Sequence, residues 1–176
     1  LKSRRQTETL HKPIENVKEL LESIKMFNYD LYLCCVLTYC CLLRPHQEIR
    51  LLKWGDFSED LRYISLSGNK VKSKRNRVVP VPKLVLNKTH NNLNIFTGRT
   101  QPYNRSYFST LWIRFKKVNL SLEQGITIYS FRHSGAIEIF KRTGSLTKLQ
   151  KAMGHSSLNV SLTYLRGLEV AELTEE

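Results

Sequence analysis

The sequence predicts a mainly α-helical fold with one small antiparallel β-sheet, an α+β architecture. Apolar residues recur at helical spacing in the first and last thirds of the chain, and two short β-forming stretches lie between residues 63 and 81. The 176 residues suit one compact domain with a sizeable core. Hydrophobic residues make up 41% of the chain, which excludes a disordered protein.

Three consecutive helices are predicted before residue 56. The first begins near Pro13, which suits a first helical turn, and its apolar residues recur at helical spacing up to Ile24. The second covers about residues 30–43. Its apolar run of 13 residues suits a buried core helix and is shorter than the roughly 20 residues that span a membrane. Pro45 opens the third, which is predicted to end near Trp54.

The hydrophobic period changes after these helices. Residues 63–66 and 78–81 are β-forming and flank a turn at 67–69, which predicts an antiparallel hairpin, and residues 82–104 are predicted to be loop. Helices are then expected over about 106–118 and 129–142, with Gly144 as the stop of the second. Ser145 and Ser156 are predicted to cap two short final helices that end at Gly154 and Gly167.

The cysteine pattern predicts no metal site. Cys34, Cys35, Cys40 and Cys41 all lie inside the apolar run, form no CxxC pair and have no histidine at ligand spacing. We expect them to be small buried residues in a reducing cytoplasm. The N-terminus is polar and basic, which excludes a secretory signal, and it lacks an initiator methionine, so we expect a fragment of a longer chain.

Positive charge is concentrated in the middle third of the chain. The sequence has 28 Lys and Arg against 15 Asp and Glu, a net charge of +13. Residues 61–122 contain thirteen basic and no acidic side chains, whereas the two kinds balance in both flanking segments. One concentrated basic surface predicts a polyanionic partner, because Lys and Arg that neutralise phosphates release counterions. The alternative is a solvated charged face.

Five short motifs follow one another along the chain. Arg44 lies in LRPHQEI (43–49) at a predicted helix start, and a lysine-bearing hairpin ends in RVVP (77–80). YSFRHS (129–134) opens a helix, MGHSS (153–157) follows, and Tyr164 comes nine residues after His155. Each motif alone is common, but the five in this order are specific.

The ordered set resembles the catalytic domain of the tyrosine recombinase (phage integrase) family over about residues 30–166. The resemblance implies site-specific DNA cleavage and rejoining through a covalent 3′-phosphotyrosine, with no metal and no cofactor. It divides the chain into a linker from a missing N-terminal DNA-binding domain (1–12), a catalytic domain (13–166) and a short tail (167–176).

The resemblance also implies the cellular setting. The partner is double-stranded DNA, and the enzyme is expected to be a tetramer on paired sites, a monomer when isolated, and not membrane-bound. We expect a bacterial, cytoplasmic and nucleoid-associated enzyme that integrates or excises a mobile element.

Matching positions suggest a role for each catalytic candidate. Tyr164 matches the family nucleophile, and Arg44 and Arg132 match the two arginines that hold the scissile phosphate. Lys72, at the usual distance before the hairpin proline, matches the general acid, and His155 matches the residue that holds a phosphate oxygen.

These residue types suit phosphoryl transfer on chemical grounds as well. A tyrosine phenolate forms the covalent intermediate that conserves the energy of the phosphodiester. Two permanently charged guanidiniums donate bidentately to the oxygens on which negative charge develops. A lysine can protonate the leaving 5′-oxygen.

Tyr129 marks a departure from the family pattern, which usually has His three residues before the second arginine. A phenol donates and accepts hydrogen bonds but is a poor base near neutral pH, so Tyr129 is an active-site candidate with no assigned proton transfer. Glu48, on the same predicted helix face as Arg44, is expected to orient nearby side chains.

Basic side chains outside the catalytic set are expected to contact the DNA backbone. They are Lys70, Lys74, Arg75, Arg77, Arg99, Arg105, Lys116 and Lys117. Two other functions stay open. A non-catalytic helix-turn-helix protein would use residues 146–164, but residues 157–165 offer few polar side chains that read bases. A type IB topoisomerase would share the chemistry, but the chain is short for one.

Overall fold

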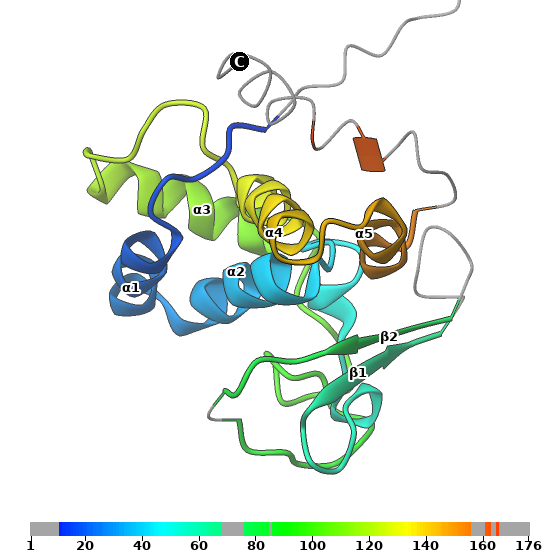
Figure 1. Ribbon diagram of the computed structural model, residues 1–176. Coiled ribbons are helices and arrows are strands. Elements are labelled where there is room, and N and C mark those ends of the chain that lie inside the picture. Colours follow the sequence, from blue (N-terminus) through cyan, green and yellow to red (C-terminus); the bar gives the residue numbers. More distant parts are fainter. Residues whose placement is uncertain (1–10, 68–75, 85, 156–160, 163–164, 166–176) are drawn as a thin grey trace, which may run out of the picture.

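The computed structural model describes residues 11–67, 76–84, 86–155, 161–162 and 165 (Figure 1). The predicted class, mainly α with a small antiparallel sheet, is confirmed. In this part of the chain no helix combines the length and hydrophobicity needed to cross a bilayer. In chain order the elements are α1 (Val17–Phe27), α2 (Tyr29–Cys41), η1 (Ile49–Leu51), η2 (Trp54–Asp56), β1 (Tyr63–Leu66), β2 (Arg77–Pro80), α3 (Tyr107–Val118), α4 (Ile128–Thr143) and α5 (Leu146–Met153).

Helix α2 is the central helix of the core, and it packs against α1, α3 and most extensively α4 (Figure 1). It is apolar on nearly every face, as a helix surrounded by protein should be. Asn28 caps its start by accepting a hydrogen bond from the Leu31 amide. The four cysteines are free thiols, buried except for the half-buried Cys40, and burial raises the pKa of Cys35.

The predicted third helix is wrong. The chain leaves α2 through Leu42, which has a positive φ of 54°, makes a turn after Arg44 and continues as the 3₁₀ helices η1 and η2. Backbone pairing with a distant segment prevents a continuous helix, because Lys53 bridges Asn94, and Leu93 and Ile95 bond to the backbone beside it. These hydrogen bonds occupy groups that an α-helix would need.

Strands β1 and β2 form the predicted hairpin, with β2 one residue earlier than expected. Tyr63 pairs with Pro80 and Leu66 with Arg77. Alternate residues face the core, so Leu66 and Val79 are buried, and so is Arg77. The predicted turn at 67–69 lies, apart from residue 67, outside the described residues.

The last predicted helices are confirmed where the structure describes them. Ser130 and Thr127 form a capping box at the start of α4, and Gly144 ends this helix in the left-handed conformation. Ser145 caps α5 by accepting from the Lys148 amide, and Gly154 ends it. Of the final predicted helix the structure describes residues 161–162, which are helical, and residue 165, which lies in a turn.

Helices α2 and α4 lie close together at Gly135. A Cβ added to this glycine would lie 2.1 Å from the carbonyl oxygen of Tyr39 and 2.8 Å from the Leu42 side chain. The absence of a side chain therefore allows the two backbones to meet. This contact sets α4 beside the end of α2, one turn from Arg132.

We expect Gly135→Ala to lower the free energy of unfolding by about 3 kcal/mol, because the added methyl group meets backbone that cannot move aside. Urea denaturation measures the change. Gly144→Ala is the matched control: it has open space around it, so it should cost only about 1 kcal/mol for its left-handed φ of 61°. Equal losses in the two variants would contradict the close approach.

Candidate active site

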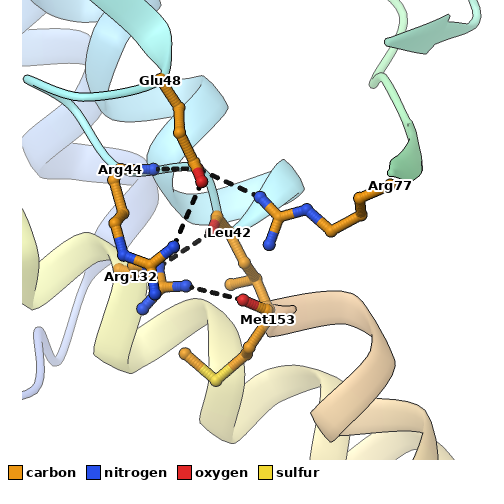
Figure 2. Close-up of polar contacts among 6 residues, drawn as sticks. All are labelled: Leu42, Arg44, Glu48, Arg77, Arg132 and Met153. Carbon is orange, nitrogen blue, oxygen red and sulfur yellow. Dashed lines mark hydrogen bonds and ion pairs between the residues drawn. The ribbon is translucent and has the colours of Figure 1, made fainter. Parts of the chain in front are cut away.

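Arg132 lies on α4 and is 2% exposed. Its Nε donates to the Leu42 carbonyl at 2.8 Å and its Nη2 donates to the Met153 carbonyl at 3.0 Å (Figure 2). Both acceptors stand at helix C-termini, where the last carbonyls lack intrahelical partners and a positive charge is favoured. The guanidinium is thereby held between the ends of α2 and α5.

Glu48 is the acidic centre of the site, with a side chain that is 0% exposed. Its Oε1 accepts from Arg44 Nη1 at 3.1 Å, and its Oε2 accepts from the Arg44 amide at 2.8 Å and from Arg77 Nη2 at 3.1 Å (Figure 2). A buried carboxylate is stable only when paired and hydrogen-bonded, and here two guanidiniums provide this. The expected orienting role of Glu48 agrees with these contacts.

His155 follows the left-handed Gly154 and is 9% exposed. Its Nδ1 lies 3.0 Å from the hydroxyl of Ser161. Burial first, and then the positive charges of Arg132, Arg44 and Arg77, lower its pKa to about 4. The imidazole is therefore neutral at physiological pH and can offer one hydrogen-bond donor.

The structure thus brings Arg44, Arg132 and His155 together from three separate parts of the chain, with Arg77 as an additional member. Three arginines and one carboxylate leave two positive charges in excess. That excess and the fork geometry of guanidinium suit a phosphodiester, whose own charge is negative. Among the described residues, no three His, Cys, Asp or Glu side chains are grouped as metal ligands.

Arg77 differs from the other described basic residues that are expected to contact the DNA backbone, because it is buried. Its side chain is 8% exposed and forms an ion pair with Glu48. Strand alternation explains this, since Arg77 shares the inward face of β2 with Val79. The two-residue spacing of Arg77 and Val79 within a strand indicates that they share a face, which basic composition alone does not reveal.

Tyr129 lies at the start of α4 among histidines. Its ring stacks on His11 with 5.3 Å between centroids, and its centroid is 6.1 Å from that of His46. Burial lowers the pKa of both histidines, and the charges of Arg50 and Arg105 lower that of His46 further. Two imidazoles whose pKa is lowered therefore lie beside Tyr129.

The remaining candidates separate into two groups. Four are exposed, as residues that contact the DNA backbone should be: Arg99, Arg105, Lys116 and Lys117. The nucleophile candidate Tyr164 and the hairpin residues Lys70, Lys72, Lys74 and Arg75 lie outside the described residues.

Comparison with solved structures places the fold in the class of tyrosine recombinase catalytic domains. The chain is similar to the Tn1549 transposon integrase in complex with a circular intermediate DNA, with a TM-score of 0.69, 18% identity, 94% of this chain and 66% of that chain covered. It is also similar to the XerH recombinase bound to palindromic difH substrate (TM-score 0.68, 20% identity, coverage 95% and 54%) and to the catalytic domain of bacteriophage HP1 integrase (TM-score 0.56, 21% identity, coverage 84% and 82%).

The sequence itself then identifies the family. The profile of the phage integrase family matches residues 12–169, so the chain belongs to that family. A curated relative, tyrosine recombinase XerC of Rickettsia prowazekii (strain Madrid E), is 28% identical over 141 residues, which is 73% of this chain and 44% of the relative. The chain therefore spans less than half the length of that relative.

We expect His155 to make stability depend on pH. Because its pKa is 6.5 when unfolded and about 4 when folded, the unfolded chain binds a proton between these values that the folded chain does not. The free energy of unfolding should therefore fall as pH falls through this window. His155→Asn should fall less steeply in urea denaturation series.

A series at pH 8 is the control, since the imidazole is neutral there in both states and only packing differs. Parallel curves for wild type and His155→Asn between pH 6.5 and 4 would contradict the lowered pKa of His155.

Proposed function

We propose that the chain is the catalytic domain of a site-specific DNA recombinase that breaks and rejoins strands through a phosphotyrosine. The observation that carries the proposal is the grouping of Arg44, Arg132 and His155, with Arg44 paired to the buried Glu48 and positive charge in excess. Membership of the phage integrase family supports the same reaction. Residues 13–166 would be the catalytic domain and 1–12 the linker that precedes it.

In the proposed reaction the Tyr164 phenol gives its proton to solvent and its oxygen attacks the scissile phosphorus. A 3′-phosphotyrosine bond forms, the bond from phosphorus to the 5′-oxygen breaks, and Lys72 gives its proton to that leaving oxygen. A 5′-hydroxyl of another strand then attacks the phosphotyrosine and gives its proton to Lys72, and the released Tyr164 oxygen takes a proton from solvent. Arg44 and Arg132 would stabilise the charge on the non-bridging oxygens, and neutral His155 would donate a further hydrogen bond.

We further propose that the substrate is double-stranded DNA, that strand exchange uses a tetramer on paired sites, and that a bacterial mobile element is the setting. Exposed basic residues in 99–117 support DNA binding, because they would lie free for phosphates. The relatives include the Tn1549 transposon integrase, which agrees with a mobile element.

We expect the full-length protein to form a covalent adduct on a nicked duplex drawn from the DNA flanking its gene, because the nick traps the phosphotyrosine. Denaturing gels detect the adduct. Tyr164→Phe should form none while keeping the wild-type DNA affinity. An adduct with Tyr164→Phe would show that another nucleophile acts, and wild-type binding with no adduct would favour the helix-turn-helix alternative.

Binding and cleavage should separate in two further variants. Lys116→Gln combined with Lys117→Gln should weaken binding and reduce the slope of log affinity against log salt by about two, because about one phosphate contact is lost per lysine. Arg132→Lys keeps the charge but loses the forked donors, so it should abolish cleavage with an unchanged salt slope. Fluorescence anisotropy and the adduct assay measure these effects. An unchanged slope in the lysine variant would remove these residues from the DNA interface.

A further inference from the structure

Arg77 is the one arginine of the cluster for which the family resemblance suggests no role. It begins β2, faces inward, and its side chain is 8% exposed. Its Nη2 donates to Glu48 Oε2 at 3.1 Å, the same oxygen that accepts the Arg44 amide. Removing a guanidinium from water costs free energy. The burial of Arg77 therefore calls for a compensating interaction or a functional role.

The Arg77 guanidinium also lies against the segment that carries His155. A Cβ built on Gly154 would lie 2.7 Å from Arg77 Nη1, so a side chain at this position would displace the guanidinium from where it lies. Gly154 is the left-handed end of α5, and His155 is the next residue. One side chain therefore touches both the Glu48–Arg44 pair and the turn before His155.

Charge sharing gives the arrangement a function. With Glu48 bonded to Arg44 alone, the buried carboxylate would neutralise Arg44 and hold its guanidinium in a closed ion pair. Arg77 takes part of the same carboxylate through Oε2, while Arg44 Nη1 uses Oε1. The pair of arginines then keeps one positive charge in excess beside Arg132.

We propose that Arg77 is a positioning residue of the active site, which shares Glu48 with Arg44 and so leaves the charge of Arg44 available to the scissile phosphate. The inference rests on the proposed recombinase function. It assigns Arg77 to the step at which charge develops on the phosphate oxygens, and not to the overall DNA affinity. The charge of Arg77 also reaches His155, whose pKa it helps to lower.

The charge argument can be tested with Arg77→Gln, Arg77→Lys and the double variant Glu48→Gln/Arg77→Gln in the full-length protein. Arg77→Gln removes one positive charge, whereas the double variant removes one charge of each sign and restores the wild-type balance. Adduct formation on the nicked duplex is measured at saturating protein, DNA affinity by anisotropy, and folding by thermal melting. Arg62→Gln, an exposed arginine near β1, controls for charge loss in the same hairpin.

We expect Arg77→Gln to slow adduct formation about tenfold or more, with DNA affinity changed less than about twofold, because the loss falls on the transition state. Arg77→Lys should keep most of the rate. The double variant should be faster than Arg77→Gln, within about tenfold of wild type, because the charge balance returns. Arg62→Gln should react like wild type.

The inference is overturned if Arg77→Gln reacts at the wild-type rate, or if the folded double variant is no faster than Arg77→Gln. If Arg77→Gln does not fold, the double variant and Arg77→Lys decide: activity in both supports charge sharing, and a folded but inactive double variant refutes it. A wild-type protein that forms no adduct refutes the recombinase function itself, and the inference with it.

Discussion

The two hydrogen bonds from Arg132 to the carbonyls of Leu42 and Met153 hold the ends of α2 and α5 against α4. Each carbonyl stands two residues before a residue of the site, Arg44 in one case and His155 in the other. A buried carbonyl left without a partner costs about 1–3 kcal/mol, so the guanidinium and the two helix ends stabilise each other. The position of both neighbouring site residues therefore depends on a side chain that is itself part of the site.

The electrostatics of the site depend on the position of these helix ends. The carboxylate of Glu48 is fully buried and pairs with Arg44 and Arg77, and it cancels only part of their positive charge. His155 stays neutral because burial and three arginines disfavour its protonated form. The site thus combines fixed positive charge with a neutral donor in surroundings of low polarity, where interactions with an anion are stronger than in water.

Local signals account for what the sequence predicted correctly. Helices α1 and α3 have apolar periodicity, α2 is a continuous apolar run, and Ser145 and Gly144 are caps that can be read within a few residues. The order of motifs located Arg44, Arg132 and His155. The third helix was wrong because bonds to residues 91–95 compete for its backbone, and such distant pairing leaves no local pattern. The burial of Arg77 was not predicted, because Arg77 was grouped with its basic neighbours by composition, whereas the pleat of β2 turns it inward.

The pairing of Leu66 with Arg77 gives the hairpin a chemical constraint in addition to a packing one. A slip of one residue would turn Arg77 to solvent and Val78, now 65% exposed, toward Glu48. An apolar side chain would then face a buried carboxylate, which no repacking of the core can accommodate. An insertion or deletion of one residue within β2 should consequently remove an arginine from the candidate site and leave its counterion unmatched.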